Sequence, residues 1–446
     1  MPTRPTIADA YVLSRSKTYP YDMEHTNKTG FSTKLGVIMA AAGSAVGLGN
    51  IWKFPYVAGE NGGGAFLIVY LLCVLLFGLP LLTTELLIGK RSGRSAYGAF
   101  RALRGNSRWQ WLSWWCIASA FIIMGFYFVV TGWCGNYLYE AVLNTYTGMD
   151  ATQLTAHFSD VVSGTPRMIL CGLVPVLMTA AVLWFDVNKG IERMSKLLMP
   201  LLLIMMVVMA VRALMLPGSG EGLRFLFRFD FGRITPQVVM MAVGQCFFSL
   251  SVGTGALITY GAYMPKQQSE ARTALQVALL DTLVAVLAGV VIFPAVFSFG
   301  YDPAEGPQLV FVVLPSILQQ MSFSWLSGVL FFLLLFIAAL TSTISLMEIA
   351  VASLCEASHD RLNRHQSVLI VTAITTVLVI LCVLSPRLFS WSDRLVTTIL
   401  MPLGALSMSL FVGWFMPRLH PALTFALRWI VPAGILLIFL NGLGVL

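Results

Sequence analysis

The sequence predicts an all-α integral membrane protein that crosses the bilayer with eleven helices. Of its 446 residues, 57% are hydrophobic and only 11% are charged, whereas soluble domains carry about 25% charged residues. The mean hydropathy is +0.81. The apolar residues gather in eleven stretches, each of about the 20 residues that a helix needs to cross a membrane. We expect these spans at residues 34–58, 63–90, 112–141, 167–186, 191–216, 236–264, 271–300, 325–356, 367–385, 394–416 and 421–444.

Basic residues set the expected orientation of the spans. With the N-terminus inside, 19 of the 28 Lys and Arg residues lie on the cytoplasmic side, seven lie outside, and Lys53 and Arg428 fall within spans. The acid-free loop 90–108 alone carries six of the inner ones. The net charge of +8 therefore reflects cytoplasmic loops beside anionic lipid, and we expect no nucleic-acid partner.

The polar segments are short. Residues 1–30 lack the apolar core of a cleaved signal peptide, and the largest loops are 142–166, 217–235 and 301–324. No G-x-S-x-G, H-E-x-x-H or P-loop motif occurs, so we do not expect an enzyme. The seven cysteines all lie in apolar spans without a C-x-x-C pair, which favours inert buried thiols.

The first and sixth spans are interrupted in the same way. GSAVGLGN (43–50) and SLSVGTGA (249–256) both carry the pattern V-G-x-G. Glycine costs a helix interior about 0.8–1.0 kcal/mol relative to alanine, and unpaired backbone groups are tolerated at membrane depth only where they face protein, ions or a polar ligand. Paired interruptions predict a midplane site. Free helix N-termini suit a carboxylate and freed carbonyls suit a cation, so we expect a site for a zwitterion and a cation.

Three segments resemble neurotransmitter:sodium symporters. GSAVGLGNIWKFPYVAGENGGGAF (43–66) is similar to their first helix and the following turn, GQCFFSLSVGTGALITYGAY (244–263) to their sixth helix, and AALTSTISLMEI (338–349) to their eighth. The resemblance runs from about residue 28 to the C-terminus, and eleven spans match a bacterial subset of the family.

The resemblance implies a fold of two five-helix inverted repeats. These would be residues 31–216 (helices 1–5) and 217–416 (helices 6–10), after a cytoplasmic segment 1–30 and before helix 11 at 417–446. It further implies a sodium-coupled symporter in the bacterial inner membrane, present as a monomer or weak dimer. Helices 1, 2, 6 and 7 would rock against helices 3, 4, 8 and 9 to give alternating access.

The same resemblance places an amino-acid substrate between helices 1, 3, 6 and 8. Its carboxylate would meet the backbone N–H groups of Leu48 and Gly49 and the hydroxyl of Tyr127. Monoamine carriers of the family place an aspartate at Gly47, whereas glycine leaves room for a carboxylate. Thr254 stands where a relative has a bulky aromatic residue, which favours a large hydrophobic or aromatic substrate. The implied substrate-site residues are Ala45, Gly47, Leu48, Gly49, Ile123, Tyr127, Phe248, Ser249, Ser251, Thr254, Ser342 and Leu346.

Two sodium sites also follow from the resemblance. The first would use Ala45, Asn50, Ser249, Asp281 and the substrate carboxylate. The second would use Gly43, Val46, Ala338, Thr341 and Ser342. All these ligands are oxygens, which suit a hard ion. The alternative for Thr341 and Ser342 is that their hydroxyls bond back to their own helix, but beside the paired breaks we favour the ion site.

Asp281 is the most informative single residue, because an ionisable group in the middle of a span costs at least about 2.5 kcal/mol and marks function by default. Chloride-dependent relatives place asparagine here, and Tyr70, Gln245 and Ser249 match their other chloride-lining positions. We therefore expect the Asp281 carboxylate to substitute for chloride. Glu85, also within a span, matches a glutamate that braces the break in helix 1. Glu348 receives no assigned role.

The implied gates pair a lysine with an acid at each side. Lys53 would pair with Asp393 outside, and Lys28 with Glu356 inside. Phe31 and Tyr263 would help to close the inner mouth, while Phe248 and Tyr127 would form an aromatic lid. For Lys53, the alternative is an interfacial lysine that reaches toward the headgroups.

Three other classes of protein remain open. A channel would need a continuous polar pore. A receptor could bind an amino acid at the same site without transporting it, and a carrier could use protons in place of sodium.

Overall fold

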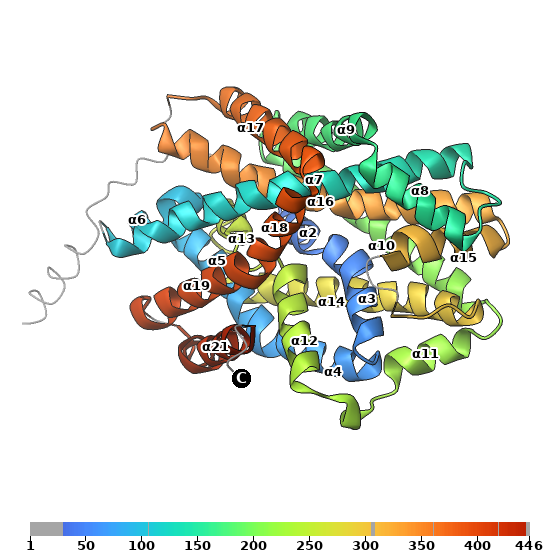
Figure 1. Cartoon of the computed structure of the whole chain (residues 1–446). Coiled ribbons are helices and arrows are strands. Elements are labelled where there is room, and N and C mark those ends of the chain that lie inside the picture. Colours follow the sequence, from blue (N-terminus) through green and yellow to red (C-terminus); the bar gives the residue numbers. More distant parts are fainter. Residues whose placement is uncertain (1–29, 106, 305–307, 360, 418, 443–446) are drawn as a thin grey trace, which may run out of the picture.

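The computed structural model describes residues 30–105, 107–304, 308–359, 361–417 and 419–442, which contain helices and no β-strand. Figure 1 shows an elongated bundle of helices. The short helix α6 (Ala96–Arg104) lies at one end, whereas α8 (Ala151–Ser163), α11 (Ser219–Phe227) and α15 (Leu314–Gln320) lie at the other. These short helices connect the long ones and cap the two ends of the bundle.

The first five predicted spans are all helical. The first comprises α2 (Lys34–Ala45), the π-helical turn η1 (Gly49–Lys53) and α3 (Phe54–Glu60). The other four comprise α4 (Gly64–Cys73), η2 (Val74–Gly78) and α5 (Leu79–Ser92); α7 (Trp111–Leu143), preceded by η3 (Arg108–Gln110); α9 (Thr165–Leu183); and η4 (Asn188–Glu192) with α10 (Arg193–Leu214).

The remaining spans follow a similar plan. The sixth comprises α12 (Pro236–Ser249) and α13 (Ala256–Ala262), after the short turn η5 (Phe231–Arg233). The others comprise α14 (Glu270–Ser298); α16 (Ser324–Ala357), preceded by η6 (Leu309–Val313) and α15; α17 (Arg364–Leu384); α18 (Pro386–Leu395), η7 (Val396–Leu400) and α19 (Met401–Phe415); and α20 (Pro421–Phe425), η8 (Ala426–Ile430) and α21 (Val431–Gly442).

Not every predicted span is a full-length helix. Within the described residues, eight helical runs are long and apolar enough to cross a membrane, and the first span adds a ninth as a pair of helices bent by 49°. The sixth span is split into two helices that are each too short, and the last apolar helix, Pro421–Leu437, falls just short. The all-helical membrane fold is confirmed, whereas the count of eleven holds only if these two are included.

The break in the first span follows from close packing at Gly47. Thr33 begins α2 by accepting a hydrogen bond from the Gly36 N–H, and the helix ends at Ala45. A Cβ atom on Gly47 would lie 2.4 Å from the Ser342 hydroxyl oxygen and 2.8 Å from that of Tyr127. Only glycine therefore lets this stretch of backbone approach α7 and α16 so closely.

The break in the sixth span uses left-handed backbone. Ser251, Gly253 and Gly255 have φ of 53°, 89° and 81°, a region that glycine adopts without strain. A Cβ on Gly253 would meet the Met401 carbonyl oxygen at 2.3 Å. Glu85 Oε1 accepts the Gly253 N–H at 2.6 Å and Oε2 accepts that of Leu257 at 3.2 Å. Glu85 thus braces the break in the sixth span, and the expectation that it braces the first was wrong.

The tenth span begins earlier than hydropathy indicated. We expected it at 394–416, but the helix runs from Pro386 to Phe415. Ser385 caps it by accepting the Leu388 N–H, and proline stands in the first turn, where its missing N–H has no helical partner to lose. The first turns, PRLFSWSDRL, are polar. Hydropathy therefore did not indicate that the helix begins at Pro386.

Candidate functional site

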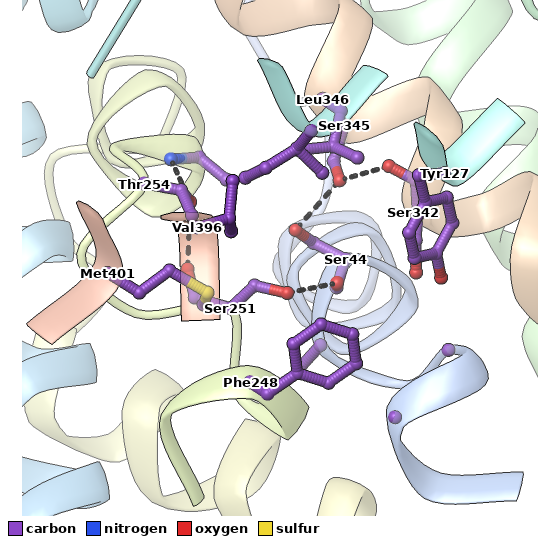
Figure 2. Close-up of a pocket in the computed structure, with 15 residues that line it drawn as sticks. Ser44, Tyr127, Phe248, Ser251, Thr254, Ser342, Ser345, Leu346, Val396 and Met401 are labelled. Atoms are coloured by element: carbon purple, nitrogen blue, oxygen red, sulfur yellow. Dashed lines mark hydrogen bonds between the residues drawn. The ribbon is translucent and has the colours of Figure 1, made fainter. Parts of the chain in front are cut away.

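The two broken spans face one cavity. It has an empty volume of about 460 Å³ and lies between the breaks on one side and helices α7 and α16 on the other. Figure 2 shows its lining side chains directed toward one another. The lining residues are Ser44, Ala45, Gly47, Gly49, Ile123, Tyr127, Phe248, Ser251, Thr254, Ala256, Ser342, Ser345, Leu346, Val396 and Met401.

Ten of the twelve residues predicted for the substrate site line this cavity, and Leu48 and Ser249 lie behind it. Five lining residues were not predicted: Ser44, Ala256, Ser345, Val396 and Met401. Ser345 lies one turn after Ser342 on α16, so helical periodicity could have identified it. Val396 and Met401 belong to the tenth span, which carried no sequence signal for the site.

One wall of the cavity suits a carboxylate. The Leu48 N–H donates to the Tyr127 hydroxyl at 3.3 Å, so the N–H group and the hydroxyl that the resemblance assigned to the substrate lie next to each other. The Gly47 N–H is held at 3.0 Å by Asn50 Oδ1. Because Gly47 has no side chain, the space before these donors stays open.

The opposite wall is a chain of hydroxyl groups, which Figure 2 shows. Ser251 donates to the Ser44 carbonyl at 3.2 Å, Ser44 donates to Ser345 at 2.9 Å, and Ser345 donates to the Ser342 carbonyl at 2.8 Å. Thr254 donates to the Ser251 carbonyl at 2.8 Å. None of the described lining residues is charged, so the cavity offers hydrogen bonds without a fixed charge.

Asp281 lies beside the cavity and is fully buried, with 0% of its surface exposed. Its carboxylate accepts hydrogen bonds from Asn50 Nδ2 at 2.8 Å, from Ser249 Oγ at 2.9 Å and from the Tyr70 hydroxyl at 3.3 Å. Among the described residues no Lys, Arg or His forms an ion pair with it. A buried carboxylate without a cationic partner is costly, and its oxygen-rich surroundings suit a hard monovalent cation.

The residues predicted for the first sodium site are neighbours, since Asn50, Ser249 and Asp281 are in direct contact and Ala45 lines the adjoining cavity. Gln245 lies against the same region: its Nε2 donates to the Gly49 carbonyl at 2.6 Å, while its buried Oε1 has no hydrogen-bond partner within the described part of the chain. Sodium binding at this cluster stays a prediction.

The residues of the second predicted sodium site are also neighbours. Ser342 Oγ lies 3.5 Å from the Val46 carbonyl and 3.4 Å from that of Ala338. Thr341 donates to the Ala338 carbonyl at 2.9 Å, and a Cβ on Gly43 would touch Thr341 at 3.4 Å. The hydroxyls thus bond back to α16, as the alternative reading expected, and they do so beside the freed carbonyl of the first span.

A second cavity lies directly beyond the first and has an empty volume of about 430 Å³. Tyr127 and Phe248 line both cavities, so the two aromatic side chains stand between them. Lys53 and Asp393 also line the second cavity. Among the described residues they form no ion pair; instead the Lys53 ammonium lies 4.0 Å from the Phe248 ring centroid. The implied ion pair is replaced by a cation–π contact.

At the inner end, Lys28 lies outside the described residues. Glu356 accepts hydrogen bonds from the Ser95 N–H at 2.9 Å and hydroxyl at 2.6 Å, and lies 3.5 Å from Arg94. Phe31 is buried and packs edge-on against Tyr263, with ring centroids 6.1 Å apart. The Phe31 N–H donates to the Tyr263 carbonyl at 3.0 Å.

Two further carboxylates, those of Glu348 and Glu192, connect separate segments at the inner end of the molecule. The Tyr263 hydroxyl donates to Glu348 at 2.8 Å, and Arg364 binds both Glu348 oxygens at 3.0 and 2.9 Å. Sequence alone gave Glu348 no role, because its partner lies 16 residues away on the next helix. Glu192 at the start of the fifth span accepts the Ser32 N–H at 2.7 Å and the Thr33 hydroxyl at 2.7 Å, which ties the start of α2 to the fifth span.

Comparisons with known proteins agree with this architecture. A sequence model of the Sodium:neurotransmitter symporter family matches residues 28–157 and 145–418. The uncharacterized sodium-dependent transporter YhdH of Bacillus subtilis is 36% identical, over 95% of this chain and 100% of the relative. The sodium-dependent serotonin transporter of Drosophila melanogaster is 28% identical, over 75% of this chain and 60% of the relative.

A solved structure is also similar. The crystal structure of MhsT in complex with L-phenylalanine superposes with a TM-score of 0.85 at 37% sequence identity. The match covers 93% of this chain and 99% of MhsT.

Proposed function

Because the chain belongs to the sodium:neurotransmitter symporter family and is a multi-pass, sodium-dependent transporter, we propose that it imports a neutral L-amino acid with a hydrophobic or aromatic side chain. One observation carries this proposal. The cavity between the two helix breaks offers backbone groups and hydroxyls, and none of its described lining residues carries a charged side chain. Such a site suits a zwitterion whose own side chain is uncharged.

The side-chain preference rests on the apolar part of the cavity. Ile123, Phe248, Leu346, Val396 and Met401 supply a hydrophobic wall, and Thr254 leaves more room than an aromatic residue would. MhsT, the similar solved structure, is complexed with L-phenylalanine. We therefore take L-phenylalanine as the first substrate to test.

Two sodium ions would drive uptake, one beside Asn50, Ser249 and Asp281 and one beside Thr341 and Ser342. One charge that crosses 100 mV gains about 2.3 kcal/mol, and a tenfold gradient adds about 1.4 kcal/mol. Two ions thus supply roughly 7 kcal/mol, which corresponds to an accumulation of about five orders of magnitude. The Asp281 carboxylate would replace chloride, which makes transport chloride-independent.

Transport would follow alternating access in a bacterial inner membrane with the N-terminus in the cytoplasm. The moving part would be helices 1, 2, 6 and 7, drawn from both repeats (31–216 and 217–416), against a scaffold of helices 3, 4, 8 and 9. The second proposed ion site bridges the two parts, because the first span contributes Val46 and α16 contributes Ser342. The first proposed ion site lies within the moving part, where the first, sixth and seventh spans meet.

The test is uptake of radiolabelled L-phenylalanine by purified protein in proteoliposomes. An inward sodium gradient should produce accumulation, replacement of sodium by choline should abolish it, and replacement of chloride by gluconate should leave it unchanged. A severalfold fall in gluconate would overturn the chloride-independent mechanism. Competition by all twenty amino acids would define the substrate.

The same assay separates the other candidate functions. A sensor on this fold would bind L-phenylalanine with sodium in detergent but accumulate none in proteoliposomes. A proton-coupled carrier would accumulate it in choline under a proton gradient. A channel would pass current in a planar bilayer at rates far above those of a carrier.

A further inference from the structure

The short helix α11 lies at the edge of the molecule, on the same end as α8 and α15 (Figure 1). One face of it is fixed by close packing. A Cβ on Gly222 would lie 2.4 Å from the Phe293 backbone, and the Phe225 ring lies 5.0 Å from that of Phe293 and 5.2 Å from that of Phe297. Leu226 is buried beside them. The helix is therefore held against the end of α14.

The opposite face is open. Leu223, Arg224, Phe227 and Arg228 line a surface groove on it. Phe227 is 43% exposed, and Phe229 and Phe231, which follow the helix, are 48% and 68% exposed. Since α14 ends at Ser298 and α4 begins at Gly64, this face lies beside the ends of two membrane spans, and we infer that it lies at the depth of the headgroup layer. Exposed aromatic side chains are expected at that depth.

The arginines of this segment differ in their partners. Arg233 pairs with Asp230 at 3.4 Å. Among the described residues, the side chains of Arg224 and Arg228 have neither an ion pair nor a hydrogen bond, although Glu221 is exposed one turn before Arg224. Basic residues are depleted on the outer side of membrane proteins. Two exposed guanidinium groups without a protein partner in the described chain, beside exposed phenylalanines, form a basic and aromatic surface of the kind that attracts anionic headgroups.

We propose that this groove binds an anionic glycerophospholipid of the leaflet on the α11 side. Arg224 and Arg228, spaced one helical turn apart, hold its phosphate, since a guanidinium group binds phosphate in a bidentate manner. Leu223 and Phe227 contact the acyl chain. The inference is independent of the transported substrate, because none of these residues lines the central cavity.

The test uses full-length protein purified in detergent and incubated with phosphatidylglycerol or phosphatidylcholine, with bound lipid counted by native mass spectrometry. The variant is Arg224→Gln with Arg228→Gln, and the matched control is Arg233→Gln, whose arginine lies in the same segment but is already paired. The double variant should retain about tenfold less phosphatidylglycerol, whereas the control should retain it as the unmodified protein does. An unchanged thermal unfolding midpoint in detergent reports that the double variant is folded.

Three results would overturn the proposal. Equal phosphatidylglycerol retention by the double variant would mean that the arginines do not hold the lipid. An equal loss in Arg233→Gln would point to diffuse attraction by positive charge. Competition by inorganic phosphate without any preference between the two lipids would indicate a site for a free anion. Retention that falls only in the double variant supports the groove.

Discussion

At the scale of single residues, we propose that Asp281 and Gly47 define what the cavity accepts. Asp281 places a buried negative charge beside the cavity, and only hydroxyl and amide groups of the described chain surround it. Gly47 provides the room in front of the Leu48 N–H and the Tyr127 hydroxyl. In this proposal, Asp281 determines the charge beside the cavity and Gly47 determines the shape of the cavity.

Substitution of Asp281 by Asn tests the charge. The amide keeps the size of the side chain but removes its charge, and charge-assisted contacts contribute about 1.5–3 kcal/mol. We expect the apparent affinity for sodium to fall at least about tenfold and L-phenylalanine binding to become sensitive to chloride. Glu140→Gln is the control, because this buried carboxylate is already paired with Arg167 and His157. A sodium titration in which Asp281→Asn matches the unmodified protein contradicts the assignment.

Substitution of Gly47 by Ala tests the shape. The new methyl group would overlap the hydroxyls of Ser342 and Tyr127, and overpacking costs about 1–3 kcal/mol. We expect L-phenylalanine affinity, measured by scintillation proximity, to fall about tenfold or more. Gly244→Ala is the control, because nothing lies within 4 Å of its Cβ position in the sixth span. Similar affinities for both variants would show that Gly47 does not shape the site.

At the scale of elements, buried carboxylates hold the broken first and sixth spans to neighbouring helices. Glu85 on α5 holds the break in the sixth span. Glu192 holds the start of α2, which would have to separate from the fifth span when the inner mouth opens. In the proposed alternating-access mechanism, opening must release the Glu192 hydrogen bonds, whereas the Glu85 hydrogen bonds join two helices of the same moving part.

Substitution of Glu192 by Ala should loosen the start of the first span. It removes the acceptors of the Ser32 N–H and of the Ser32 and Thr33 hydroxyls. We expect faster hydrogen–deuterium exchange in peptides that cover residues 31–45, with exchange in α7 unchanged. Glu140→Gln again serves as the control, since it removes a buried carboxylate at the other end. Equal exchange in both variants would mean that Glu192 does not hold α2.

At the scale of the whole molecule, sodium and substrate should bind cooperatively, because the Asp281 cluster adjoins the cavity through Asn50 and Gly47. Coupling between sites is reciprocal. We expect the affinity for L-phenylalanine to rise with sodium concentration and the affinity for sodium to rise by the same factor with L-phenylalanine. Thermal stability in the presence of both ligands should exceed that with either alone. Calorimetric affinities that do not depend on the second ligand would contradict this coupling.

The sequence alone identified the residues that are unusual inside apolar membrane helices. The V-G-x-G pairs and the lone Asp281 stand out against apolar helices, so the breaks and the carboxylate could be predicted. Contacts between distant spans could not. The partner of Glu85 lies 168 residues away, Lys53 packs on Phe248, and Val396 and Met401 reach the cavity from a helix whose polar start masked its length. Helical periodicity describes which residues share a face of one helix, so it does not predict contacts between residues on different spans.

The contact between Gly253 and the tenth helix has a further consequence. A Cβ on Gly253 would strike the Met401 carbonyl, and one on Gly404 would strike the Gly253 carbonyl at 2.3 Å. The backbone of the break in the sixth span is therefore in direct contact with the backbone of α19 at Gly253 and Gly404. We therefore expect that a tilt of the unwound turn toward the tenth helix displaces this helix, although it lay outside the predicted moving group, and that the position of the tenth helix differs between the empty and the occupied cavity.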